Sequence, residues 1–172
     1  MSLPMELVQR ETRGKPIVLI LLFGVLFLSF ACEKMESVTK QKNCEPTLYD
    51  EIGPFYRPNA PVRSKVGNGG YLLRGKVLST EKCRPLGNAM LEFWLVNVDG
   101  QYDDSHRATV FSDTLGNYSF ESNIPSDYVG RLPHIHLRVS AQGFEELITQ
   151  HYPEKGTVSS DFTIVLPPAS KK

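Results

Sequence analysis

The chain has 172 residues, of which 19 are basic and 19 are acidic, so its formal net charge is zero. This length is typical of a single domain. A balanced charge gives no electrostatic reason to expect nucleic-acid binding. The sequence therefore predicts one domain and no nucleic-acid partner.

The N-terminal segment differs in composition from the rest of the chain. A basic segment over residues 10–15 precedes an apolar run over 16–31, which ends at Cys32. A basic region followed by an apolar stretch is typical of a secretory signal peptide, and this stretch is short for a transmembrane helix. We therefore expect an exported protein.

The end of the apolar run resembles a bacterial lipobox, in which a cysteine is lipidated after cleavage of the signal. Ser29 departs from the pattern, because an aliphatic residue is usual at that position. We predict a lipoprotein signal peptide over 1–31, lipidation of Cys32 and a polar tether over 32–43. This implies a membrane-anchored bacterial lipoprotein on the periplasmic or cell-surface face. An uncleaved anchor and ordinary secretion remain alternatives.

Two cysteines, Cys44 and Cys83, remain if Cys32 carries the lipid. In an oxidising compartment an even pair of cysteines readily forms a disulfide. We predict that these two are bonded, with two unpaired thiols as the alternative.

From Cys44 onward the sequence has the pattern of an all-β domain. Residues 52–61 form a proline-rich arm, which suits neither a regular helix nor a central strand. We find no amphipathic helix of ordinary length. Short strand-like segments separated by turns predict a single β-sandwich domain over 44–168. The expected strands cover residues 71–78, 89–96, 107–111, 118–121, 132–139, 146–151 and 162–166.

The segment over 132–139 carries two histidines. Ile135, Leu137 and Val139 alternate with more polar residues, as in a strand with one apolar face. His134 and His136 would then share the other face, and two imidazoles spaced in this way can turn toward one metal ion. The alternative is a half-buried strand that happens to contain two histidines.

Two tyrosines, Tyr102 and Tyr128, are expected in loops next to strand ends, where each alone would be an ordinary loop residue. Five motifs nevertheless occur together and in order, namely Gly53-Pro54-Phe55-Tyr56, Trp94 to Tyr102, Gly116-Asn117-Tyr118-Ser119-Phe120, Pro125 to Tyr128 and Arg131-Leu132-Pro133-His134-Ile135-His136. This combination resembles the intradiol ring-cleavage dioxygenases, a family that includes protocatechuate 3,4-dioxygenase and catechol 1,2-dioxygenase. The resemblance covers about 44–166 and is to the compact, exported branch of the family.

The resemblance implies a mononuclear, non-haem Fe3+ held by four side chains, here Tyr102, Tyr128, His134 and His136. Ligand chemistry agrees with this set. A phenol has a pKa of about 10, so its binding as phenolate at neutral pH needs a strongly Lewis-acidic cation. Histidines alone would suit zinc, copper or iron, whereas two added phenolates favour ferric iron.

The resemblance also implies the reaction. With O2, such enzymes cleave a catechol-type ring between its two hydroxyl-bearing carbons. Tyr128 would leave the metal when substrate binds, Arg131 would stabilise negative charge on the substrate ring, and Gln150 would lie close to the iron pocket. Whether the chain forms a homo-oligomer is left open.

Two rival functions remain at this stage. One is a non-catalytic surface β-sandwich that serves as a binding or spacer module, and the other is an iron-binding relic of the family without turnover. The natural substrate is also open, because only residues 129–133 separate Tyr128 from His134, where better-known members have a longer insertion. We expect structural or solvated roles for His106 and His151, and a packing role for Trp94.

Overall fold

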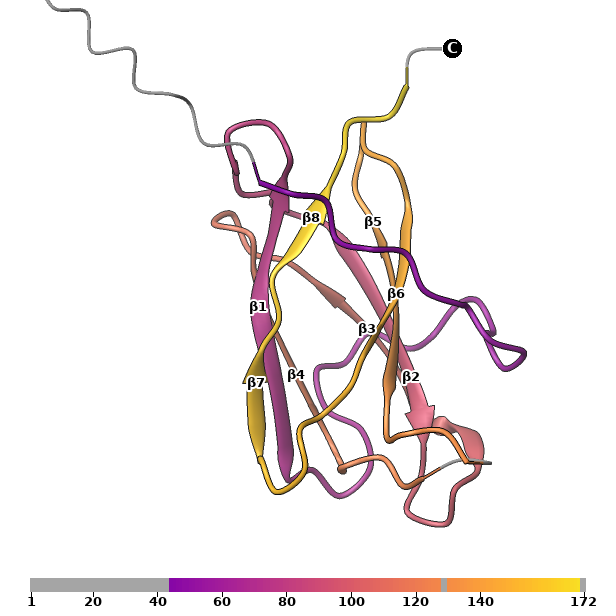
Figure 1. Ribbon diagram of the computed structural model, residues 1–172. Coiled ribbons are helices and arrows are strands. Elements are labelled where there is room, and N and C mark those ends of the chain that lie inside the picture. The colour runs from indigo at the N-terminus through magenta and orange to yellow at the C-terminus, as the bar shows by residue number, and fades with distance from the viewer. Residues whose placement is uncertain (1–43, 128–129, 171–172) are drawn as a thin grey trace, which may run out of the picture. The chain divides into compact units, whose positions relative to one another are not determined.

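The structure of this protein is a computed structural model, and it describes residues 44–127 and 130–170. The described residues form strands and no helix, which confirms the predicted all-β class (Figure 1). The strands are β1 (Tyr71–Ser79), β2 (Met90–Val96), β3 (Tyr102–Phe111), β4 (Asn117–Ser122), β5 (Ile135–Ser140), β6 (Leu147–His151), β7 (Ser159–Asp161) and β8 (Ile164–Leu166).

The predicted signal peptide, the tether and Cys32 lie outside the described residues. Within the part of the chain that the structure describes, no helix is long and apolar enough to cross a membrane.

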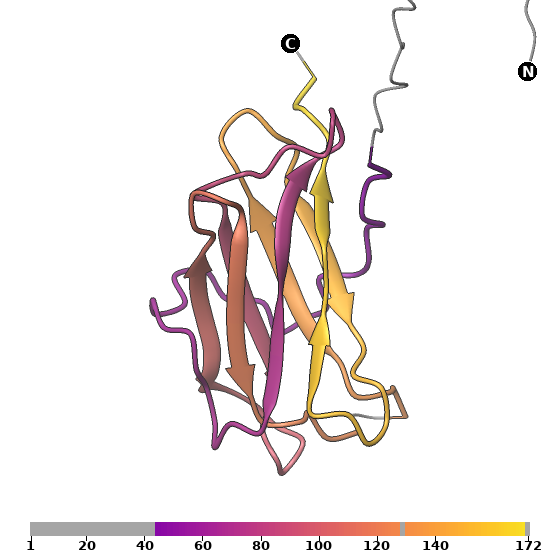
Figure 2. The ribbon, with the colours of Figure 1, turned by 90° about the vertical axis from the view of Figure 1, so that its left-hand side faces the viewer.

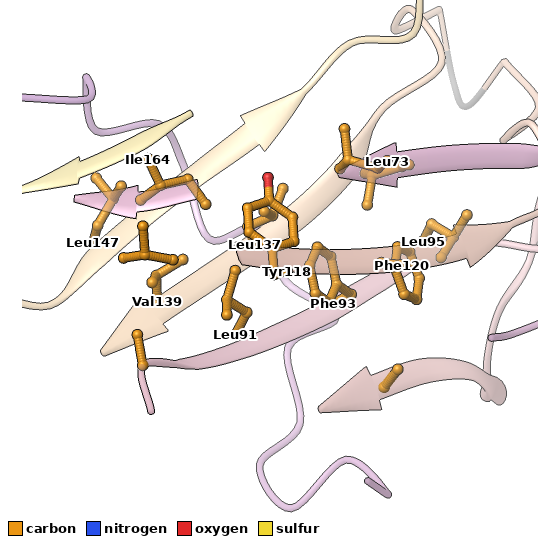
Figure 3. Close-up of a cluster of buried hydrophobic side chains, with 14 of the residues drawn as sticks. Leu73, Leu91, Phe93, Leu95, Tyr118, Phe120, Leu137, Val139, Leu147 and Ile164 are labelled. Carbon is orange, nitrogen blue, oxygen red and sulfur yellow. The ribbon is translucent and has the colours of Figure 1, made fainter. Parts of the chain in front are cut away.

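The strands form two four-stranded sheets that lie face to face (Figure 2). One sheet has the order β4-β1-β7, with β8 also paired to β1, and the other has the order β3-β2-β5-β6. Apolar side chains from both sheets fill the space between them, as Figure 3 shows. The fold is therefore the predicted β-sandwich. The labelled core residues are Leu73, Leu91, Phe93, Leu95, Tyr118, Phe120, Leu137, Val139, Leu147 and Ile164.

The outer face of the β3-β2-β5-β6 sheet carries the polar residues that the sequence analysis selected. Alternation along β2 and β5 sends Phe93 and Leu137 into the core, so Trp94 and His136 point the other way. The antiparallel register pairs His136 with Trp94 on one side and with Gln150 on the other. These three side chains therefore form one row across the outer face.

Residues 44–66, which we call the N-terminal arm, lie against this sheet and against β8 (Figure 1). A disulfide joins Cys44 to Cys83 at the start of the arm. Further along, the Asp50 N–H donates to the Ile148 carbonyl at 2.9 Å, and the Thr109 N–H donates to the Pro61 carbonyl at 2.8 Å. Because the arm covers the outer face, β2 is buried on both faces.

A largely buried ion pair between β2 and β5 binds a tyrosine of the arm. Arg138 Nη1 lies 2.6 Å from Glu92 Oε2, and it donates a second hydrogen bond of 2.8 Å to the Tyr56 hydroxyl. The same Tyr56 hydroxyl lies 3.1 Å from Glu92 Oε2. The other end of the guanidinium pairs with Glu146, whose side chain is 43% exposed compared with 5% for Glu92. We call Tyr56, Glu92 and Arg138 the arm lock.

Two strands start three or more residues away from the predicted position. The strand expected from residue 132 begins at Ile135, because Pro133 has no N–H to give to a ladder. His134 therefore precedes the strand and is not one of its alternating residues. The strand expected from residue 107 begins at Tyr102, because the pairing of Tyr102 with Val96 extends the β2–β3 ladder.

The strand expected over 162–166 is shortened to β8, and β7, which was not expected, precedes it. Between them the Phe162 N–H donates to the Arg74 carbonyl at 2.8 Å, and the Phe162 carbonyl accepts a 2.6 Å hydrogen bond from the Tyr118 hydroxyl. The Phe162 carbonyl also lies where a side chain at Gly75 would have to sit. Glycine at that position of β1 is therefore required by the local packing.

Removing the carboxylate of the arm lock should destabilise the protein. Glu92→Ala leaves the Arg138 guanidinium without its buried partner, and we expect the free energy of unfolding to fall by about 3 kcal/mol. Glu146→Ala removes the exposed partner of the same guanidinium and should cost less than about 1 kcal/mol. Urea denaturation of both variants tests this, and equal losses would show that the buried partner of Arg138 contributes no more than the exposed one.

A second prediction concerns the buried pair of Tyr71 and His151, whose hydroxyl oxygen and Nε2 are 2.7 Å apart. Burial lowers the pKa of His151 to about 4. The unfolded chain takes up the proton near the ordinary value of about 6.5, so the contribution to stability is complete above that pH and is lost as the pH falls toward 4.

We therefore expect the protonation of His151 to lower the free energy of unfolding by about 3 kcal/mol between pH 7 and pH 4. Urea denaturation of the metal-free protein across this range measures the pH dependence, which should be shallower in His151→Gln. An unchanged slope in that variant would contradict the assignment.

Candidate metal centre

Three predicted ligands meet on the outer face of the β3-β2-β5-β6 sheet. The Tyr102 hydroxyl oxygen lies 3.1 Å from His136 Nε2 and 3.3 Å from His134 Nε2. Ligand atoms bonded to one transition metal at roughly 2.1 Å are about 3 Å apart when their bonds are at right angles. One oxygen and two nitrogens thus converge at the spacing that a shared metal ion requires.

The β2–β3 turn places Tyr102. Within it the Asn97 side-chain oxygen accepts hydrogen bonds from the N–H groups of Asp99 and Gln101, at 2.9 and 3.0 Å. After a register shift in β2, Tyr102 pairs with Val96 and begins β3. Irregularities of this kind redirect a side chain at the end of a ladder.

His134 is oriented by its own backbone segment. Its Nδ1 lies 2.7 Å from the Leu132 carbonyl oxygen, which can only accept, so Nδ1 carries the proton. The lone pair is then on Nε2, the atom that faces Tyr102. This contact with a carbonyl is the usual way in which proteins orient a metal-binding histidine.

The His136 ring is packed against the Trp94 ring and against the arm at Gly53. The Trp94 ring stacks on it with a centroid distance of 4.9 Å and an interplanar angle of 3°. On another side is Gly53, where an added Cβ would lie 3.1 Å from His136 Cε1 and where φ is +70°. Only glycine combines that close approach with that backbone conformation at little cost. The arm thus packs directly against a predicted ligand.

The electrostatic environment keeps both imidazoles neutral. Burial lowers the pKa of His134, and the Arg131 charge adds to the decrease. Burial, followed by the neighbouring His134 imidazole and the Arg131 charge, lowers the pKa of His136 to about 3. Neutral imidazoles offer the lone pairs that a metal binds.

The donor set fits ferric iron better than a classical zinc site. Within residues 44–127 and 130–170, no group of three or more His, Cys, Asp and Glu side chains could hold a metal. A metal at the convergence point would therefore depend on the Tyr102 oxygen, and a phenolate favours a hard, strongly Lewis-acidic ion. Tyr128, the fourth predicted ligand, lies outside the described residues.

Arg131 and Gln150, the two predicted residues around the metal, lie together. Arg131 Nη2 donates to Gln150 Oε1 at 3.0 Å, and Gln150 Nε2 donates to the Glu51 carbonyl at 2.8 Å. Gln150 is also the β6 partner of His136. Both side chains therefore stand beside the converging donors.

The remaining histidines lie in other surroundings. His106 Nδ1 lies 2.8 Å from Asp103 Oδ1 and borders a cavity of about 530 Å³ that none of the three converging ligands lines. His151 points into the core toward Tyr71. Both contacts agree with the structural roles expected for these residues.

Sequence reasoning assigned no role to several residues that surround the candidate metal centre. Phe55 stacks on the Tyr102 ring, with centroids 4.5 Å apart and an interplanar angle of 13°. Tyr152 lies 6.0 Å from His134, centroid to centroid. The Gly53 to Tyr56 motif was visible in the sequence, but its meaning depends on where the arm crosses the sheet.

Comparison with known proteins agrees with this geometry. The chain is 32% identical to a catechol 1,2-dioxygenase of Candida albicans over 77% of its own length, and 33% identical to catechol 1,2-dioxygenase 2 of Acinetobacter lwoffii over 72%. It spans 55% and 56% of the lengths of these two relatives. No model of a protein family matches the chain.

A solved structure also resembles it. The dioxygenase domain of a dioxygenase and carbohydrate-binding fusion protein from a cellulolytic Streptomyces superposes with a TM-score of 0.66 at 26% identity, covering 73% of this chain and all of that domain. The two relatives and this solved structure are all described as dioxygenases. The chain belongs to the intradiol ring-cleavage dioxygenase family.

Loss of one converging donor should weaken metal binding. We expect His136→Gln to lower the affinity for ferric iron by at least about tenfold, because only two of the described donors remain. The measurement is the iron content of the purified protein after reconstitution and dialysis. His106→Gln removes a buried histidine elsewhere and should keep the wild-type iron content. Equal iron in both variants would exclude His136 as a ligand.

Proposed function

We propose that this protein is a non-haem Fe(III)-dependent intradiol dioxygenase, which cleaves a catechol-type ring between its hydroxyl-bearing carbons with O2. The observation that carries the proposal is the convergence of the Tyr102 oxygen with His134 Nε2 and His136 Nε2. A spacer module has no use for such an arrangement. The names of the relatives, which are catechol dioxygenases, support the same substrate class.

In this proposal Tyr102, His134 and His136 hold the ferric ion together with Tyr128, whose place in the set rests on the sequence motif. A bound ferric ion would supply Lewis-acid chemistry that makes a catechol reactive toward O2. Tyr102 must lose its phenolic proton to serve as a ligand, and the two imidazoles need to lose none, because burial already keeps them neutral.

Arg131 and Gln150 would act on the substrate. The Arg131 guanidinium lies beside the donors and carries a fixed positive charge, so it can stabilise the negative charge that a doubly deprotonated catechol brings. Gln150 is fixed at both ends of its amide, by Arg131 and by the Glu51 carbonyl. It can therefore orient a bound ring without reorganisation. Trp94 and Phe55 keep the rings of His136 and Tyr102 in place.

The location follows as part of the proposal. We propose that the signal peptide over 1–31 exports the chain and that Cys32 carries the lipid that anchors it to a bacterial membrane. The disulfide between Cys44 and Cys83 supports an oxidising compartment. The substrate would then be an aromatic compound present outside the cytoplasm.

Arg131→Gln should separate binding of iron from turnover. We expect wild-type iron content but a fall in kcat/KM of about a hundredfold, because the variant loses charge stabilisation and keeps the metal ligands. Oxygen consumption with catechol, together with the ultraviolet absorption of the ring-opened diacid, gives the rate.

The matched control is Arg84→Gln, which changes an arginine whose side chain is 61% exposed, in an i,i+3 pair with Glu81. It should keep the wild-type rate. If the iron-loaded wild-type protein consumes no oxygen with any of a panel of catechols, the chain is an iron-binding relic and the proposed activity is wrong.

A further inference from the structure

Tyr152, the residue that follows β6, occupies a position that neither the sequence motifs nor the proposed mechanism uses. Its hydroxyl oxygen lies 3.1 Å from Gln150 Oε1, 3.1 Å from Asp50 Oδ2 and 3.4 Å from Arg131 Nη2. One phenol thus touches both residues expected to act on the substrate, and a carboxylate of the arm.

The chemistry of the groups in this cluster determines which of them donates each hydrogen bond. The Arg131 guanidinium can only donate, and the Tyr152 hydroxyl has a single proton to give. Gln150 Oε1 already accepts from Arg131 at 3.0 Å, whereas Asp50 offers a charged acceptor, which forms the stronger bond. The consistent arrangement is Arg131 donating to the Tyr152 oxygen and Tyr152 donating to Asp50.

The cluster joins three separate parts of the chain. Arg131 precedes β5, Gln150 lies in β6, and Asp50 belongs to the N-terminal arm. The arm contacts the cluster twice, since the Glu51 carbonyl next to Asp50 accepts the hydrogen bond from the Gln150 amide. Both hydrogen bonds that the described residues show for the Arg131 side chain end on Gln150 or Tyr152. The position of the guanidinium therefore depends on this cluster.

The cluster also borders the candidate metal centre. The Tyr152 ring is 6.0 Å from the His134 ring. Together with Leu132 and Pro133 it lines a cavity of about 510 Å³. The Arg131 guanidinium, which contacts the Tyr152 hydroxyl, is therefore held close to His134.

We propose that Tyr152, backed by Asp50, is a positioning residue that holds the Arg131 guanidinium beside the candidate metal centre, and through Arg131 the Gln150 amide. The effect of this positioning on catalysis rests on the proposed function. The hydrogen-bonded arrangement itself can be tested without metal or turnover.

The first test uses the metal-free protein. Tyr152→Phe removes one oxygen and keeps the ring that packs near His134. We expect the exchange of the Arg131 side-chain N–H protons with water, followed by NMR of arginine-labelled protein, to accelerate about threefold to tenfold, the equivalent of one lost hydrogen bond. Tyr49→Phe, which removes the same oxygen from an arm tyrosine that is 68% exposed, should leave the rate unchanged. Unchanged exchange in Tyr152→Phe would overturn the proposal.

A double variant tests whether Asp50 acts through Tyr152. Asp50→Ala should accelerate the same exchange, and Tyr152→Phe/Asp50→Ala should be no faster than Tyr152→Phe alone, because both changes break one chain of hydrogen bonds. Effects that multiply in the double variant would show that the two residues act independently, and the proposal would be wrong.

The second test uses the iron-loaded protein. Tyr152→Phe should bind wild-type amounts of ferric iron but bind catechol, under anaerobic conditions, about threefold to tenfold more weakly. A spectrophotometric titration gives this affinity, with Tyr49→Phe as control. Equal catechol affinity in both variants contradicts the positioning role. Failure of the wild-type protein to bind catechol contradicts the proposed function and leaves the exchange experiment valid.

Discussion

The buried ion pair between Arg138 and Glu92 is the contact on which the rest of the structure depends. It lies on the outer face of a sheet, where an exposed pair would contribute little, but the arm covers it and Tyr56 bonds to both partners. The two charged groups offer a strong acceptor and a strong donor to one hydroxyl, so they hold Tyr56, and with it the arm, in this position. The path of the arm past His136 and Tyr102 follows from it.

The candidate metal centre is a product of that covered face. β2 and β5 supply Trp94 and His136 in register, but a bare sheet would leave both open to water. The arm brings Gly53 against His136 and Phe55 against Tyr102. By burying the imidazole of His136, the arm lowers its pKa and keeps it neutral at ordinary pH. Asp50 and Glu51, a few residues earlier in the arm, fix Tyr152 and Gln150. The strands thus supply the side chains of the candidate metal centre, and the arm that covers them fixes their positions.

Local pattern predicted the fold class and a possible metal-binding role for the two histidines, and it failed where position depends on contacts distant in sequence. Alternation identified the strand with Ile135, Leu137 and Val139, whereas Tyr102 was selected only by the resemblance to the dioxygenase family. The start of that strand was wrong by three residues, because Pro133 and the contact of His134 with the Leu132 carbonyl override alternation. The roles of Phe55, Asp50 and Tyr152 could not be predicted, since each depends on where the arm meets the sheet.

The central claim is that the Tyr102 oxygen and two histidine nitrogens bind ferric iron, and the visible spectrum of the reconstituted protein tests it most directly. A phenolate bound to Fe3+ gives a charge-transfer band in the visible region, and resonance Raman excitation in that band selects tyrosinate vibrations. We predict such a band at one iron per chain, with altered tyrosinate vibrations and a weaker band in Tyr102→Phe. A colourless protein that binds iron, or an identical spectrum in that variant, would contradict the account.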